Sequence, residues 1–249
     1  MRMLYSPADW PVRRDALAPL DQAASRLYQK LSKLDIEALE ISAYSQRYLR
    51  DLTHVHVLRV MLQRYAYLLA WALDGSQAPY EQFVLVDYGG GTGILSLLAR
   101  EMGIGRVIYN DIYEVSTRDA RVIAQALGLP AEMYVTGDLA ELNAYFQEKQ
   151  LRYQAVVSYD VIEHIYDIEG FLRELPACAG AQARIVMASS ANPFNPRIRA
   201  KLEAHQRHLD AFDRPAAVGD KQRDTHTAYA RVRAEIIRAH AAALTPQEI

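Results

Sequence analysis

A glycine-rich turn between an apolar run and a helical stretch constrains this chain more than any other feature. The turn reads Asp87-Tyr-Gly-Gly-Gly-Thr-Gly93. It follows the β-branched run at residues 83–87 and directly precedes the helical stretch at residues 94–102. Glycines at alternate positions let the backbone turn sharply and let a ligand approach where a Cβ atom would clash. Free N–H groups at the start of the following helix suit a carboxylate or phosphate. The sequence therefore predicts a strand, a ligand-binding turn and a helix.

The same alternation of strand and helix continues beyond the turn. Four helical stretches separate five short runs that are typical of strands; the runs lie at 83–87, 107–109, 133–136, 155–158 and 184–188, and the stretches at 94–102, 115–127, 139–149 and 168–175. Strands that alternate with helices predict a parallel sheet with both faces covered. We therefore predict the fold class as α/β.

The glycine spacing distinguishes between nucleotide-binding folds. The dinucleotide fingerprint G-x-G-x-x-G is absent, because its last position falls on Ile94 or Ser96. The pattern that starts at Asp87 instead resembles motif I of the class I S-adenosylmethionine-dependent methyltransferases, a superfamily with a Rossmann-like core. Three further motifs resemble this family in the same order: Asp111 after the second strand, Gly137-Asp138-Leu139 after the third, and Ser158-Tyr-Asp160-Val-Ile-Glu163-His164 after the fourth.

The resemblance implies S-adenosyl-L-methionine as cofactor and assigns residues to it. It places Asp87 and the turn glycines against the methionine and ribose, Asp111 on the ribose hydroxyls and Asp138 near the adenine amino group. An N-terminal helix that carries Tyr44 and Tyr48 is expected to cover the cofactor. The complete set of cofactor candidates is Asp87, Gly89, Gly91, Gly93, Asp111, Ile112, Asp138, Leu139, Tyr159, Tyr44 and Tyr48. The aspartates as turn caps and the tyrosines as core packing stay open as alternatives.

The segment after the fourth strand holds the candidates for chemistry. Methyl transfer is an in-line displacement that needs proximity, alignment and a deprotonated acceptor. Asp160 faces the crevice where open α/β sheets bind ligands, and the unperturbed pKa of a histidine such as His164 lies near neutrality. We name these two as catalytic candidates. A related interpretation makes Asp160, Glu163 and His164 ligands of a divalent metal, with a further ligand from His205, His208 or His226. We favour a structural role for Glu163 and His164 in this segment and predict no metal.

Helical patterns flank the core on both sides. The N-terminal pattern has an expected break near Leu52 and Thr53, and Gly75-Ser-Gln-Ala-Pro79 marks a boundary. Relatives in this family usually end the sheet with two more strands, yet no strand signal follows Ala188, so either helices replace those strands or the chain is a shortened one. We divide the chain into an N-terminal helical segment at 1–79, a Rossmann-like core at 80–191 and a helical C-terminal tail at 192–249, a substrate-side element.

The function that we expect is methyl transfer to a small molecule such as a carbohydrate or a biosynthetic intermediate. The alternatives are a metal-assisted O-methyltransferase acting on an RNA 2′-hydroxyl or a catechol-type acceptor, a non-catalytic cofactor-binding scaffold and, last, a nicotinamide dehydrogenase. A net charge of −2 without interleaved aromatic and basic residues predicts no nucleic-acid partner. The N-terminal helices offer a surface for a homodimer.

Composition sets the expected compartment. Cys178 is the only cysteine, which excludes an intrachain disulfide and a Cys-based zinc cluster within one chain. The longest apolar run, 65–73, is shorter than the roughly 20 residues that span a bilayer. The first residues lack the apolar stretch of a secretory signal. We therefore expect a soluble cytoplasmic protein without a membrane partner.

Overall fold

The computed structural model describes residues 14–76, 78–190, 194–213, 227–241 and 244–245. The chain forms two compact units, Met1–Ser189 and Ser190–Ile249. The N-terminal helices and the sheet belong to the first unit, and the C-terminal helices form the second. Each unit is described by itself.

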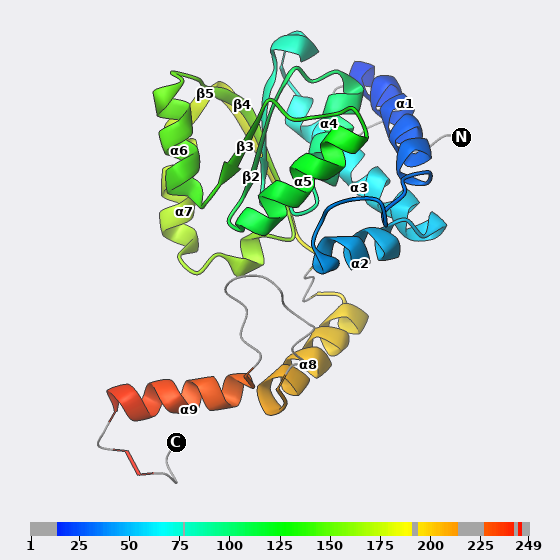
Figure 1. The fold of residues 1–249 in the computed structure, drawn as a ribbon. Coiled ribbons are helices and arrows are strands. Elements are labelled where there is room, and N and C mark those ends of the chain that lie inside the picture. Colours follow the sequence, from blue (N-terminus) through cyan, green and yellow to red (C-terminus); the bar gives the residue numbers. More distant parts are fainter. Residues whose placement is uncertain (1–13, 77, 191–193, 214–226, 242–243, 246–249) are drawn as a thin grey trace. The chain divides into compact units, whose positions relative to one another are not determined.

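A parallel sheet forms the centre of the first unit (Figure 1). Its strands are β1 (Val84–Tyr88), β2 (Arg106–Asp111), β3 (Met133–Thr136), β4 (Tyr153–Tyr159) and β5 (Ala179–Ala188). They lie in the order β3-β2-β1-β4-β5, and every neighbouring pair is parallel. The order reverses between β1 and β4, and open α/β sheets bind ligands beyond the carboxyl ends of the strands at such a point. The predicted α/β, Rossmann-like fold class is confirmed.

Helices cover both faces of this sheet, because successive strand residues point to opposite sides. Leu85, Val107 and Ala155 pack in one core with helices α1, α3, α4 and α5. Val86 and Ile108 pack in a second core with α6 and α7. The helices are α1 (Arg14–Leu31), α3 (Val55–Leu73), α4 (Ile94–Met102), α5 (Glu114–Ala126), α6 (Leu139–Glu148) and α7 (Ile168–Glu174).

The N-terminal helical pattern breaks where the sequence predicts. Helix α2 (Ala43–Leu52) ends at Thr53, whose N–H donates to the carbonyl of Leu49, and α3 begins two residues later. Apolar side chains of α1 and α3, among them Leu27 and Leu69, are fully buried in the core that also holds one face of the sheet. These helices are therefore part of the same hydrophobic core as the sheet.

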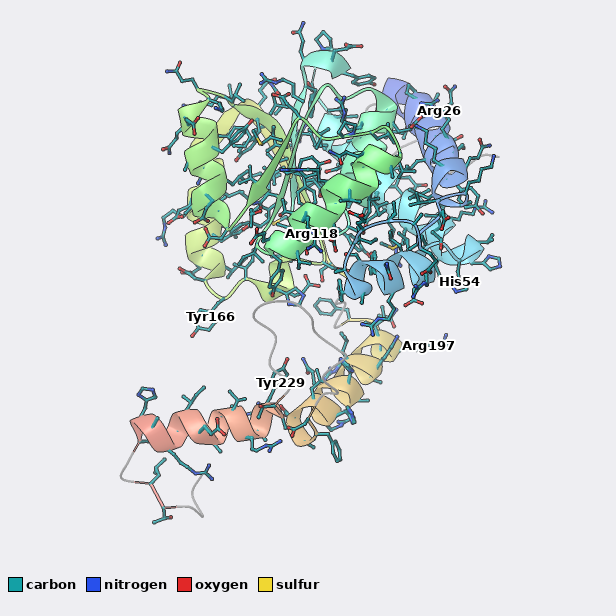
Figure 2. The ribbon with its side chains drawn as sticks, in the orientation of Figure 1. Arg26, His54, Arg118, Tyr166, Arg197 and Tyr229 are labelled. Atoms are coloured by element: carbon teal, nitrogen blue, oxygen red, sulfur yellow. The ribbon has the colours of Figure 1, made fainter. Side chains whose placement is uncertain are left out.

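The start of α2 is fastened to α5 by one buried carboxylate. Oδ2 of Asp119 accepts hydrogen bonds from the backbone N–H of Ser42 at 3.0 Å and from its hydroxyl at 2.5 Å. Oδ1 accepts from Nη2 of Arg118 at 2.8 Å, and Arg118 lies on α5 (Figure 2). The Asp119 side chain is fully buried, and a buried charge is stable only when it is paired and hydrogen-bonded. This contact fixes where α2 lies on the first unit.

The second unit contains the helices α8 (Pro196–Ala211) and α9 (Tyr229–His240). Asn195 caps α8 through its side-chain oxygen. Asp213 accepts from the N–H of Ala228 at 2.8 Å and pairs with Arg231. The predicted helical tail is confirmed, and the described residues that follow β5 form no strand.

No helix within the described ranges combines the length and the apolar character needed to cross a membrane.

Replacing Asp119 by alanine tests the anchoring of α2. We expect Asp119→Ala to lower the free energy of unfolding by about 3 kcal/mol, because hydrogen bonds to a charged group contribute roughly 1.5–3 kcal/mol each. Urea denaturation followed by circular dichroism measures the loss. Ser42→Ala is the matched control and should cost only about 1 kcal/mol, since it keeps the backbone N–H. Equal stability of Asp119→Ala and wild type would refute the anchor.

Candidate functional site

The turn after β1 packs closely against the segment that follows β4 at Gly89 and has open space beside Gly91. The backbone is left-handed at three of its glycines, with φ of +70° at Gly89, +55° at Gly91 and +78° at Gly93. A Cβ atom on Gly89 would lie 2.4 Å from a methyl group of Val161, whereas one on Gly91 would meet no atom within 4 Å. The turn therefore leaves room above Gly91 for a ligand.

Two aspartates fix the shape of this turn. Oδ2 of Asp87 accepts from the N–H of Ser96 at 3.0 Å and from its hydroxyl at 2.6 Å. Oδ2 of Asp111 accepts from the N–H of Gly91 at 3.0 Å, and its Oδ1 accepts from the N–H of Tyr113 at 2.9 Å. A carboxylate has about four acceptor sites, so Asp111 still has capacity for the ribose hydroxyls that the sequence assigns to it.

Burial changes the acidity of Asp87. Removal from water raises the pKa of this carboxyl to about 6, although the hydrogen bonds from Ser96 favour the ionised form. The nearby Asp111 adds to the increase. A carboxyl at the base of the turn therefore ionises only near neutral pH.

Three further residues predicted to bind the cofactor, Asp138, Leu139 and Ile112, lie at the ends of β2 and β3. Asp138 caps α6, since its Oδ1 accepts from the N–H of Ala140 at 2.8 Å. Its own N–H donates to Glu141 at 2.8 Å, which completes a capping box. Leu139 is buried, and Ile112 is 40% exposed directly after Asp111. The structure gives Asp138 a capping role, and its adenine contact and the cofactor contacts of Leu139 and Ile112 stay predictions.

Three tyrosines, Tyr48, Tyr65 and Tyr159, form a cluster beside the end of β4. The rings of Tyr65 and Tyr159 meet edge to face with centroids 5.5 Å apart. Burial raises the pKa of Tyr48, and Tyr65, Tyr44 and Asp160 are close enough to affect it further. The structure thus brings the predicted Tyr44, Tyr48 and Tyr159 to one place.

The sequence analysis did not predict two residues of this region, Tyr65 and Arg64. Tyr65 lies in the apolar part of α3, where helical spacing predicts only core packing. Nη1 of the preceding residue, Arg64, donates to the hydroxyl of Tyr159 at 2.8 Å. An arginine directly before a tyrosine on α3 was the available signal, but contacts between residues so distant in sequence leave no periodic pattern.

The segment after β4 is strained and partly exposed. Asp160 has φ of +55°, and its N–H donates to the carbonyl of Ala188 at 2.9 Å. Non-glycine residues rarely adopt this conformation, and such residues cluster at functional sites. Glu163 is exposed and accepts from the hydroxyl of Ser189 at 2.9 Å, and His164 is exposed as well. The catalytic roles of Asp160 and His164 stay predictions.

The described residues do not gather the ligands that the alternative metal site would need. Within the described parts of the chain, no group of three His, Cys, Asp or Glu side chains could hold a metal ion. His205 and His208 belong to α8 in the second unit, and His226 lies outside the described residues.

Comparison with known proteins identifies a family match. A family model described as a methyltransferase domain matches residues 24–236. No curated protein sequence matches the chain.

Several solved structures are similar at low identity. A SAM-dependent methyltransferase from Aquifex aeolicus is 18% identical over 42% of this chain and 55% of its own, with a TM-score of 0.36. A ribosomal protein L11 methylase from Lactobacillus delbrueckii subsp. bulgaricus is 18% identical over 57% and 67%, with a TM-score of 0.40. The plantazolicin methyltransferase BpumL, in complex with SAH, is 12% identical over 68% and 62%, with a TM-score of 0.42. The match thus spans about half the length of the Aquifex chain.

The raised pKa of Asp87 predicts a specific pH dependence of stability. Between the ordinary value of 3.8 and about 6 the folded protein holds a proton that the unfolded chain has lost. The Asp87 contribution to the free energy of unfolding therefore falls as pH rises through this window, by on the order of 3 kcal/mol. Asp87→Asn cannot ionise, so its stability relative to wild type should increase from pH 4 to pH 7.

Urea denaturation at several pH values between 4 and 7 measures this difference. Asp167→Asn makes the same substitution at an exposed carboxylate and is the matched control for the change of side chain itself. A constant difference between Asp87→Asn and wild type across the window would contradict the assignment.

Proposed function

We propose that this protein, which belongs to the methyltransferase-domain family, transfers the methyl group of S-adenosyl-L-methionine to a small molecule such as a carbohydrate or a biosynthetic intermediate. Family membership rests on a match over residues 24–236, which include the whole sheet. The protein is accordingly an S-adenosylmethionine-dependent methyltransferase. The small-molecule acceptor is the part that we propose.

The residues around the turn fit this cofactor. The space above Gly91 admits a ligand close to the backbone. Asp111 is buried next to that space and can accept further hydrogen bonds from vicinal hydroxyls. When bound, the cofactor supplies a methyl group on a positively charged sulfur, which an aligned nucleophile can attack. The task of the protein is then to hold both reactants in line.

Support for the proposed acceptor comes from the tyrosine cluster and Asp160, which lie next to the glycine turn. Asp87 pairs with Val157 in the parallel register, so the end of β4 lies level with the start of the turn. Aromatic rings pack on apolar faces of a small molecule, and phenol hydroxyls bind its polar groups. A carboxylate at Asp160 is suited to accept the proton of a hydroxyl acceptor. This combination favours a polyhydroxylated small molecule over a polymer.

Binding of the cofactor tests the first half of this function. In calorimetric titrations, we expect S-adenosylmethionine and S-adenosylhomocysteine to bind and NAD not to bind. Asp111→Ala should weaken both by about tenfold to a hundredfold, since hydrogen bonds to a charged group are lost. Asp167→Ala, an exposed cap of α7, is the control. A folded protein that binds neither sulfur compound would refute the function.

The role of Asp160 is testable separately in an acceptor screen. We expect turnover, followed as release of S-adenosylhomocysteine, with at least one sugar or sugar derivative, assayed with and without Mg²⁺. Asp160→Asn should lower kcat by about a hundredfold, because general-base catalysis contributes roughly 10²–10⁴. Its affinity for S-adenosylhomocysteine should stay unchanged. Glu163→Gln, three residues away and exposed, is the matched control. Equal loss in both variants would remove Asp160 from the chemistry.

A further inference from the structure

Arg64 is an exposed arginine whose guanidinium is held at the edge of the tyrosine cluster. Its Nη1 donates to the Tyr159 hydroxyl at 2.8 Å and lies 3.8 Å from the sulfur of Met61. A guanidinium has five N–H donors in a planar fork that matches carboxylate and phosphate oxygens. These contacts use only Nη1, so most of the fork stays available for a ligand.

Three other arginines of the first unit are already neutralised. Arg26 pairs with Glu101, Arg118 with Asp119 and Arg184 with Asp74, at distances between 2.6 and 3.1 Å. Arg64 differs from them, because no carboxylate among the described residues forms an ion pair with it. An arginine that is fixed by a neutral tyrosine keeps its full charge for an incoming anion.

The position of Tyr159 connects this charge to the reaction. Tyr159 is the last residue of β4, directly before Asp160 and two residues beyond Val157, which pairs with Asp87. Arg64 therefore contacts the residue that directly precedes Asp160, at the end of the strand that pairs with β1.

Charges of both signs act on Tyr159. Burial has the largest effect on the hydroxyl of Tyr159 and raises its pKa. Asp160 and Glu163 raise this pKa further, whereas Arg64 lowers it. The two carboxylates repel an anion, and Glu163 is also hydrogen-bonded to Ser189. The complementary ligand therefore has a hydroxyl near Asp160 and its negative charge at Arg64.

We infer that the methyl acceptor carries an acidic group, a carboxylate or a phosphate, and that Arg64 binds this group while Asp160 faces the hydroxyl that is methylated. The inference rests on the proposed function and narrows its acceptor class to acidic hydroxyl compounds. Arg64 is thus a specificity-determining residue supplied by α3.

Three matched sugars test the inference on the full chain loaded with S-adenosylhomocysteine. Glucose is neutral, glucuronate carries a carboxylate and glucose 6-phosphate carries a phosphate, so the two acidic arms separate the two sources of charge. Ligand-observed NMR titration measures each Kd. We expect at least one acidic sugar to bind about tenfold or more tightly than glucose. Arg64→Gln should abolish that preference, and Arg64→Lys should keep part of it.

Arg59→Gln is the matched control, because Arg59 is an exposed arginine on the same helix that is absent from the contacts of Tyr159. It should leave the preference unchanged. Equal affinity for acidic and neutral sugars, no binding of any of the three, or the same loss in Arg59→Gln and Arg64→Gln would overturn the inference. Binding of S-adenosylhomocysteine in the same samples separates the outcomes, since its failure would count against the proposed function itself.

Discussion

The hydrogen bond from Gly91 to Asp111 is the contact on which the arrangement of the site depends. It joins the turn after β1 to the end of β2, and the hydroxyl of Tyr109 binds the carbonyl of the same glycine at 2.6 Å. With these bonds in place, the turn keeps its left-handed residues and the open space above Gly91. Asp87 fixes the other end of the turn on α4 through Ser96. The shape of the glycine turn is therefore fixed by contacts within the protein itself.

The acceptor side that we propose is built differently, from the end of β4 together with helices that precede the sheet in sequence. Helix α2 contributes Tyr48, α3 contributes Arg64 and Tyr65, and β4 contributes Tyr159. These elements can meet only because α1 and α3 share the hydrophobic core of one sheet face. In a Rossmann-like fold the sheet gives the cofactor site, whereas function is set by what is placed over it. Here the N-terminal helices provide that part.

Local patterns in the sequence predict the elements well and the contacts between them poorly. The break between α2 and α3, the five strands and the glycine turn follow from spacing and residue type. The sequence predicts the last strand from residue 184, but β5 begins at Ala179, which pairs with Tyr153 of β4 before the register shifts and Arg184 pairs with Ala155. The residues between, such as Ala181, have low strand propensity, so the sequence pattern does not reveal this first part of the strand. The contacts of Ser42 with Asp119 and of Arg64 with Tyr159 span 77 and 95 positions. Periodicity carries no information at that range, so these contacts require the fold.

Two buried carboxylates in the first unit respond to acid in opposite directions. Burial is the largest effect on both, yet at Asp119 the hydrogen bonds from Ser42 and Arg118 outweigh it and lower the pKa, whereas at Asp87 burial prevails. Asp119 therefore stabilises the fold above its ordinary pKa and loses that contribution as pH falls, while protonation of Asp87 relieves a cost. The two carboxylates respond in different pH ranges. Between about 6 and the ordinary value of 3.8 only Asp87 takes up its proton, whereas Asp119 stays ionised until the pH falls below that value. Acid therefore first removes the cost of a buried charge beneath the glycine turn, and only stronger acid weakens the hold of Asp119 on the start of α2.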